Sequence, residues 1–204
     1  MQKLSLFLSL IILLFASCEK SSNNDIIIDE DVIAFVELNA SQYDVNILDS
    51  LVTGKFEKFS FSEGDTVNHD NWDVAFSGTT IIINGGESFI NNQPNRSGNA
   101  AVYIATGLMS DIRTVDVTKL VQDYSNSAAI VDDFGFTGMG WCTYSGLPDH
   151  IISPIPGKVL VFRTHDNKYA KVEILSFYDT PITSEYGGFY TFNYVYQSAG
   201  KINF

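Results

Sequence analysis

The sequence has few of the residues that cross-links and metal centres require. Two cysteines, Cys18 and Cys142, and three histidines, His69, His150 and His165, occur in 204 residues. The histidines lie far apart and form no His-Glu-x-x-His pattern. We therefore expect neither a disulfide framework nor a structural or hydrolytic zinc site.

Motifs for covalent catalysis are absent as well. The sequence contains no Gly-x-Ser-x-Gly and no phosphate-binding loop, and no local signature marks Cys142 as a nucleophile. Acidic pairs such as Asp132 with Asp133, or Asp29 with Glu30, could in principle do acid–base work. Because nothing in the pattern gives the two members different proton affinities, we expect a solvated charged surface instead. The sequence predicts a protein that is not an enzyme.

Positive charge is scarce. Twelve Lys and Arg stand against 24 Asp and Glu, so the formal net charge is -12, and the basic residues form no dense block. A negative field repels phosphate backbones, which argues against nucleic acid as a partner. With 45% hydrophobic and 13% aromatic residues, the chain is not of the disordered class. Its length fits one domain with a short appendage.

No hydrophobic run is long enough to cross a membrane as a helix. The apolar stretch Leu4 to Ala16 has 13 residues, whereas a spanning helix needs about 20. Together with Lys3 before it, this run predicts a signal peptide over residues 1–17. Cys18 follows two small residues and resembles the modified cysteine of a bacterial lipoprotein. The alternative is an ordinary cleaved secretory signal, which leaves Cys18 as a free thiol.

If Cys18 is lipidated, residues 18–25 form the acylated cysteine and a polar tether, and residues 26–204 form the folded domain. Acyl chains contribute about 0.8 kcal/mol per buried methylene, so they can hold an acidic chain at a membrane. Lipidation also leaves Cys142 without an intramolecular partner. We find no repeat and no internal boundary in the folded part.

From about Val32 onward, apolar and polar residues alternate with period two, and turn residues interrupt the pattern every 8 to 15 positions. This pattern is typical of an all-β protein, here a single antiparallel β domain with at most one short helix. The predicted strands are 32–39, 55–62, 72–84, 100–105, 112–117, 158–164, 169–178 and 188–197.

Three local features are more specific. Residues 158–178 predict a hairpin whose turn is the polar segment Thr164 to Lys168. Val117, Leu120, Val121 and Tyr124 fall at helical spacing, so the short helix is expected there. Two long loops, 85–98 and 132–156, are candidates for function, because loops of that length in a compact domain are often functional.

Six blocks of sequence stand out for their order and spacing. They are 59–64 (FSFSEG), 71–76 (NWDVAF), 84–88 (NGGES), 136–145 with Trp141, the hairpin 157–178, and 191–194 (TFNY). In that order they resemble the HmuY family, haem-binding surface lipoproteins of Bacteroidetes. The resemblance covers most of residues 55–197.

The resemblance implies a hand-shaped all-β fold that grips one haem between protruding strands and loops, with two protein side chains on the iron. It also implies a haemophore-like role: the protein takes haem from host haemoproteins and passes it to an outer-membrane receptor, without covalent chemistry. The expected place is the cell outer membrane, with the domain lipid-anchored and surface-exposed. Such a protein serves iron acquisition.

The iron donors of the best-known family pattern are missing at their expected positions. A histidine follows the Trp-x-x-aromatic-Ser block in that pattern, but Trp141 to Ser145 is followed here by Gly146. The second donor belongs to a segment that is shortened here between Val117 and Phe134, where there is neither His nor Met. The resemblance therefore implies the fold more firmly than the ligand.

Some relatives use methionine in place of histidine, so Met109, Met139 and the nearby His150 are the candidate haem-binding residues, with Met139 and His150 as the expected iron donors. Each has a simpler interpretation. Met139 beside Trp141 could fill a gap in the core, Met109 could belong to the core, and His150 could be an exposed loop residue.

We expect no haem-binding role for the remaining histidines and tryptophans. We expect His69 and His165 in solvent and Trp72 and Trp141 in the core. Two hypotheses follow. The first is a lipoprotein that binds haem or a related porphyrin, and the second is a HmuY-like surface adhesin or scaffold that has lost haem binding, for which Gly146 is the reason.

Overall fold

The computed structural model describes residues 31–44, 50–51, 55–182 and 187–204. The predicted signal peptide, Cys18 and the tether lie outside these residues. Within them, the fold is all-β, as predicted, and every strand pair is antiparallel. No helix of the described part is long and apolar enough to span a bilayer.

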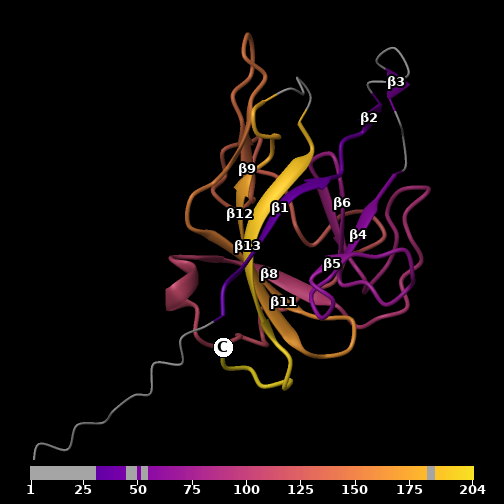
Figure 1. Ribbon diagram of the computed structural model, residues 1–204, viewed down its shortest axis with the longest axis vertical. Coiled ribbons are helices and arrows are strands. Elements are labelled where there is room, and N and C mark those ends of the chain that lie inside the picture. Colours follow the sequence, from indigo (N-terminus) through magenta and orange to yellow (C-terminus); the bar gives the residue numbers. More distant parts are fainter. Residues whose placement is uncertain (1–30, 45–49, 52–54, 183–186) are drawn as a thin grey trace, which may run out of the picture.

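The largest sheet has five strands in the order β1-β13-β12-β11-β8 (Figure 1). Their bounds are β1 Ile33–Asn39, β8 Ala101–Thr106, β11 Lys158–Arg163, β12 Tyr169–Ser176 and β13 Phe189–Gln197. The hairpin predicted over 158–178 is confirmed: β11 and β12 pair from Val159 with Glu173 to Arg163 with Tyr169. Its turn contains Asn167, whose φ of 65° is one that asparagine tolerates well.

A second sheet has four strands in the order β5-β4-β6-β7. Their bounds are β4 Glu57–Ser60, β5 Asp65–Thr66, β6 Val74–Ser77 and β7 Thr80–Ile83. Two small pairs complete the fold, namely β9 Cys142–Tyr144 with β10 Ile152–Pro154, and β2 Tyr43–Asp44 with β3 Ser50–Leu51. The helical content of the described part is one 3₁₀ turn, η1, at Met109–Asp111.

The main core lies between the two large sheets and is rich in aromatic rings. Phe59 of β4 meets Phe192 of β13 edge to face, with ring centroids 5.3 Å apart, and Phe76 of β6 packs against Tyr190 at 4.7 Å. Such pairs add about 0.5–1.5 kcal/mol beyond the area that they bury. Trp141 is 2% exposed and belongs to this core, and Trp72 is 0% exposed in a smaller cluster with Ala75 and Ile82, so both tryptophans are buried as predicted.

The other face of the five-stranded sheet is also covered. Val159 and Val161 of β11 and Val195 of β13 form a second cluster with Met109 and Val115, which belong to the segment after β8. A strand with both faces buried reads as a continuous apolar run, as VLVF in β11 does. The segment 107–120 therefore serves as a cover for the sheet.

That role explains why two predictions for this segment are wrong. Residues 112–117 form no strand, and Val117 to Tyr124 form no helix. Instead, Thr114 and Val121 make isolated bridges with Asn203 and Val102. The apolar residues are spaced to cover a sheet, and their backbone groups find distant partners that outcompete a local helix.

The single strand predicted over 72–84 is a hairpin, since β6 and β7 pair from Val74 with Ile83 to Ser77 with Thr80. Gly78, with a φ of 53°, makes the turn between them. The apolar residues on both sides of this glycine hide the break, because each strand is buried along most of its length.

Candidate functional site

Two of the three candidate haem-binding residues belong to one segment, residues 131–154, which contains β9 and β10 and reaches the top of the molecule (Figure 1). Met139 is 68% exposed, and His150 is exposed in the loop between the two strands. Met109 is only 8% exposed and packs in the cluster behind the five-stranded sheet. The core interpretation thus holds for Met109 and is wrong for Met139.

Met139 is held by a hydrogen-bonded loop that starts at Asp133. The Asp133 carboxylate accepts hydrogen bonds from the Thr137 hydroxyl (2.6 Å), the Thr137 amide and the Gly138 amide (2.6 Å). The Thr137 hydroxyl in turn accepts the amide of Met139 at 3.3 Å. These bonds, the one from the Thr137 hydroxyl above all, lower the pKa of Asp133.

Asp133 corrects an expectation from the sequence. Asp133 is only 3% exposed and therefore is not part of a solvated surface, whereas its neighbour Asp132 is exposed. The reason is local, because the carboxylate satisfies the donors of a turn four and five residues further along. An Asp followed at that spacing by Thr-Gly is the signal that the sequence reasoning missed.

The loop is also tied to the five-stranded sheet. The Lys158 ammonium of β11 donates to the Gly138 carbonyl at 2.5 Å and to the Thr106 hydroxyl at 3.1 Å. Gly140 passes so close to Asp132 that an added Cβ would lie 2.2 Å from the Asp132 carbonyl carbon. Only glycine fits there, which fixes the path of the chain on the far side of Met139.

Behind the loop, Trp141 and Cys142 point into the core. The Trp141 ring lies 5.5 Å from Tyr190 and 6.1 Å from Phe177, and its indole nitrogen has no hydrogen-bond partner among the described residues. Burial raises the pKa of the Cys142 thiol to about 12. A neutral, buried thiol is neither a nucleophile nor a soft metal ligand, in agreement with the sequence.

His150 stands in a turn that closes the β9–β10 loop. Its amide donates to the Gly146 carbonyl at 2.9 Å, and its Nδ1 is hydrogen-bonded to the Tyr144 hydroxyl. The Tyr144 ring also lies 5.6 Å from the ring of Phe134. The Tyr144 hydroxyl can accept from Nδ1 or donate to it, and only the tautomer with the proton on Nδ1 leaves Nε2 with the lone pair that a metal ligand requires.

Gly146 occupies the place where the resembled pattern has its histidine. Its φ is 75°, and an added Cβ would meet nothing within 4 Å. A histidine would therefore have room at this position but would strain the left-handed backbone. The turn Gly146 to His150 presents its imidazole four residues later instead.

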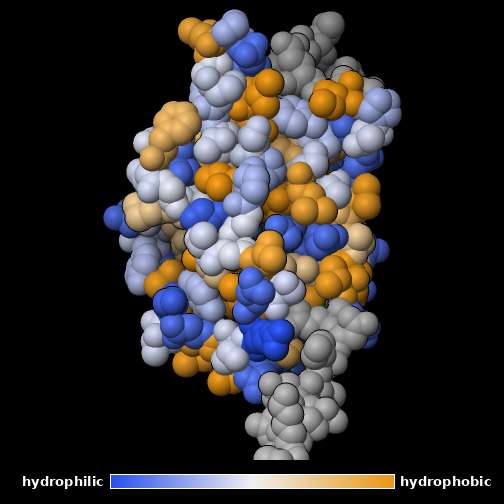
Figure 2. All heavy atoms as spheres, turned by 90° about the vertical axis from the view of Figure 1, so that its left-hand side faces the viewer, coloured by the Kyte–Doolittle hydropathy of each residue, from blue (hydrophilic) through white to orange (hydrophobic). Residues whose placement is uncertain are grey.

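Apolar side chains are exposed along the same segment. The exposed fractions range from 39% for Phe134 to 84% for Leu147, and the set is Val131, Phe134, Phe136, Met139, Leu147 and Ile151. Figure 2, which looks onto the side that carries β9 and η1, shows hydrophobic side chains exposed at several places among polar ones. Large exposed apolar residues gathered on one segment indicate a binding surface more often than isolated ones do.

The other histidines lie elsewhere. His69 is half exposed and pairs with Glu63 at 2.9 Å, as expected for a solvent-facing residue. The expectation is wrong for His165, whose side chain is 18% exposed and whose Nδ1 lies 2.8 Å from a carboxylate oxygen of Asp73. Asp73 also accepts the Phe61 amide, so it joins the β11–β12 turn to the four-stranded sheet.

Asp73, His165 and Asp166 place their ligand atoms within 4.8 Å of one another. Asp166 is paired with Lys168 at 2.9 Å, and the carboxylate of Asp73 is already satisfied by three donors. We assign these residues to the fold and not to a metal.

Several solved structures are similar to this chain, and two of them come from Bacteroides species. The first, of a proposed lipoprotein from Bacteroides fragilis NCTC 9343, has 15% sequence identity and a TM-score of 0.44, and the match covers 81% of this chain and 88% of that chain. The second, of a proposed HmuY-like heme binding protein from Bacteroides vulgatus ATCC 8482, has 16% identity and a TM-score of 0.46, covering 81% and 91%. No curated protein matches the chain.

A family model described as HmuY protein matches residues 50–194. The match runs from β3 into β13 and takes in the four-stranded sheet, the 131–154 segment and the β11–β12 hairpin. It covers well over half of the 204 residues. The ordered blocks therefore identified the family correctly, and this chain belongs to the HmuY family.

Proposed function

We propose that this protein binds haem or a related porphyrin on the 131–154 segment, with Met139 and His150 as the iron donors. One observation carries the proposal: the family match includes a segment that exposes a thioether, an imidazole and several large apolar side chains. These are the groups that haem requires, since the porphyrin needs an apolar surface and its iron needs nitrogen or sulfur donors.

The residues fit the group chemically. When His150 donates its Nδ1 proton to the Tyr144 hydroxyl, Nε2 is free to bind a metal, and Met139 extends from a loop whose backbone is fixed by Asp133 and Lys158. Bound haem would supply the iron, and the chain would hold it without covalent chemistry. Phe134 and Phe136 are exposed on the same segment as Met139, so their side chains would offer apolar contacts to the porphyrin ring.

The wider role is part of the same proposal. The match to the HmuY family supports an extracytoplasmic lipoprotein that binds haem. We place it at the outer membrane, where it would receive haem from host haemoproteins and pass it to an uptake receptor for iron acquisition.

Titration of the purified domain with ferric and ferrous haem tests the proposal. We expect a shifted Soret band, and tighter binding of ferrous haem, because a thioether prefers the softer ferrous ion. M139A and H150A should each weaken binding at least about tenfold, while H69A, which removes an exposed histidine elsewhere, should leave it unchanged. Absence of any spectral shift in both redox states would reject haem binding.

The alternative is a HmuY-like adhesin or scaffold that has lost haem. Gly146 favours it, because the family's expected donor is replaced by a glycine with a left-handed φ of 75°. The same titration decides between the two, since a scaffold gives no Soret shift with either form of haem.

A further inference from the structure

Lys158 is a half-buried cation that lies against the 131–154 segment. It is the first residue of β11 and stands opposite Thr106 of β8 in the antiparallel register. Its ammonium donates to the Thr106 hydroxyl at 3.1 Å and to the Gly138 carbonyl at 2.5 Å. That carbonyl belongs to the peptide group that joins Gly138 to Met139. The positive charge therefore lies beside the backbone of a proposed iron donor.

The charge of Lys158 is not matched by a carboxylate. Both of its partners are neutral oxygens, and no ion pair among the described residues includes it. An ammonium has three N–H donors, so these two bonds leave one donor and the whole charge for a further acceptor. Because bonds from an ammonium to a carboxylate are stronger than neutral ones, an anionic group is the acceptor that this position favours.

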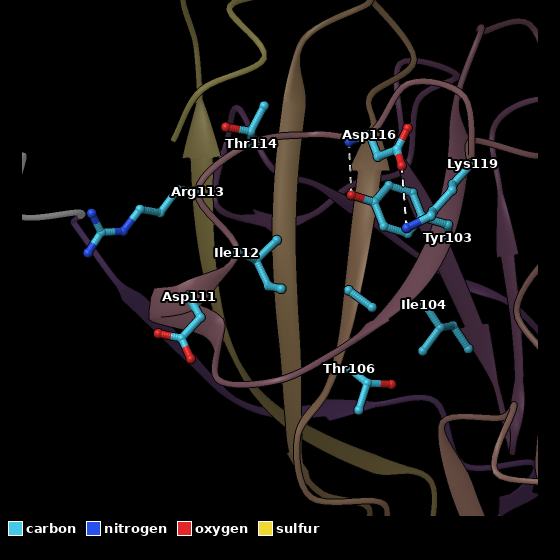
Figure 3. Close-up of a pocket in the computed structure, with 10 residues that line it drawn as sticks. Tyr103, Ile104, Thr106, Asp111, Ile112, Arg113, Thr114, Asp116 and Lys119 are labelled. Carbon is cyan, nitrogen blue, oxygen red and sulfur yellow. Dashed lines mark hydrogen bonds and ion pairs between the residues drawn. The ribbon is translucent and has the colours of Figure 1, made fainter.

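Lys119 provides a contrast. Thr106 and Lys119 both line a groove of about 600 Å³ between β8 and residues 111–119, and Figure 3 shows Lys119 beside Asp116, at the other end of the groove from Thr106. The Lys119 ammonium lies 3.3 Å from a carboxylate oxygen of Asp116. Lys119 thus has a carboxylate partner of its own, which makes it a matched control for Lys158.

The segment that Lys158 contacts is otherwise acidic. Residues 131–154 include Asp132, Asp133 and Asp149 and contain no Lys or Arg. Hydrogen bonds, above all the one from the Thr137 hydroxyl, hold the pKa of Asp133 below its usual value, so this carboxylate is ionised at neutral pH. Haem carries two propionate groups at the rim of its ring, and they are ionised at neutral pH as well. A cation close to the segment offsets the repulsion between these like charges.

We propose that Lys158 binds one propionate carboxylate of haem on the 131–154 segment and so selects porphyrins that carry free carboxylates. This proposal rests on the proposed function and adds to it a residue from outside that segment. With Met139 on the iron at the centre of the ring, an ammonium beside the Met139 backbone lies toward the rim, where the propionates are. The carboxylate takes the third N–H of Lys158, and the bonds to Gly138 and Thr106 hold the ammonium in position.

Soret titrations of the purified protein with haem and with haem dimethyl ester test the proposal. The two compounds share the iron and the ring, so the contributions of Met139 and His150 cancel when their affinities are compared. We expect the unmodified protein to bind haem about threefold to tenfold more tightly than the ester, the range for one charge-assisted bond at a partly exposed position.

Three variants separate the charge from the path of the chain. K158Q removes the charge, and K158R keeps it. We expect K158Q to lower the affinity for haem about threefold to tenfold and to leave the affinity for the ester unchanged, and K158R to keep most of the preference for haem. K119Q removes the same charge from the matched lysine and should leave both affinities unchanged. Thermal unfolding shows whether K158Q keeps its fold.

Iron-free protoporphyrin IX and its dimethyl ester give a second comparison, on the unmodified protein. These compounds keep the ring but offer nothing to the iron donors, so a difference between them reports on the carboxylates alone. Porphyrin fluorescence measures both affinities, and we expect the same preference for the free acid.

The outcomes distinguish this proposal from the proposed function. Soret shifts with equal affinities for haem and its ester would overturn the role of Lys158 and leave haem binding intact. An equal loss of both affinities in K158Q would also overturn it, since Lys158 would then act only through the path of the Met139 loop. Absence of any Soret shift with either compound would reject haem binding and this proposal together.

Discussion

Met139 stands at the end of a short relay of hydrogen bonds that begins at a buried carboxylate. Asp133 holds the Thr137 hydroxyl, and that oxygen holds the amide of Met139. Charge-assisted bonds of this kind are about twice as strong as neutral ones. The position of an exposed side chain is therefore set by a residue that has almost no exposed surface of its own.

Replacing Thr137 tests this relay with a matched pair. T137V keeps the shape of the side chain but removes the hydroxyl, and T137S keeps the hydroxyl. We expect the ¹³C-methyl NMR signal of Met139 to shift and narrow in T137V, because its backbone loses an anchor, and to stay near the native position in T137S. The signal of buried Met109 serves as an internal reference. If T137V and T137S give the same Met139 signal, the relay does not hold the residue.

The haem proposal predicts a consequence of the same pair. T137V should weaken ferrous haem binding about threefold to tenfold relative to T137S, since a less fixed donor loses more freedom on binding. Soret titrations of both variants measure this. Equal affinities, with the haem spectrum of the native domain intact, would show that Met139 binds without help from Thr137.

At the scale of elements, β13 joins the two apolar clusters. Tyr190, Phe192 and Tyr194 face the core between the sheets, and Val195 faces the cluster with Met109. The period-two alternation predicted for the strand at 188–197 is confirmed at Tyr190, Phe192 and Tyr194, which are buried with half-buried residues between them. Its other face is more buried than the pattern indicates, because the cover by residues 107–120 cannot be seen in the strand itself.

Replacing Phe192 tests how much the packing of β13 against the core contributes to stability. Its ring lies 5.5 Å from Phe35, 5.3 Å from Phe59 and 6.0 Å from Phe76, so it touches three other strands. F192A should lower the free energy of unfolding by about 3–5 kcal/mol, the usual range for removing a buried ring. N193A, on the next and only half-buried position, should change it by less than about 1 kcal/mol. Denaturant unfolding measures the free energy of unfolding of both variants. Equal losses of this free energy would show that Phe192 is not a main packing contact of β13.

The elements that could be predicted from the sequence are those that local chemistry determines. The β11–β12 hairpin has a polar turn between two strands rich in β-forming residues, and these local features were enough to predict its pairing. The conformation of residues 112–124 depends on bridges to Val102 and Asn203, which are distant in the sequence. The local spacing of apolar residues therefore predicted a strand and a helix that do not form. For the site, the pattern pointed to residues 132–156, but these are not one long loop, since β9 and β10 pair within them. The pattern also missed the burial of Asp133 and the exposure of Phe136 and Leu147.

At the scale of the whole molecule, the acidity of the chain raises the question of how it would stay at a membrane. A formal charge of -12 gives no attraction to an anionic lipid surface. No helix of the described residues could span a bilayer. Membrane attachment, if present, then depends on the acylation expected at Cys18, because acyl chains supply about 0.8 kcal/mol per buried methylene.

Fractionation of cells that express two cysteine variants tests the anchor. C18A should move the protein from the membrane fraction to the soluble fraction and abolish labelling by a radioactive fatty acid. C142A is the matched control: Cys142 is 0% exposed, so its loss should leave both the labelling and the membrane fraction unchanged. Washing the membranes with high salt distinguishes acylation from electrostatic adsorption, which salt screens. A C18A protein that stays with salt-washed membranes would mean that another part of the chain holds it there.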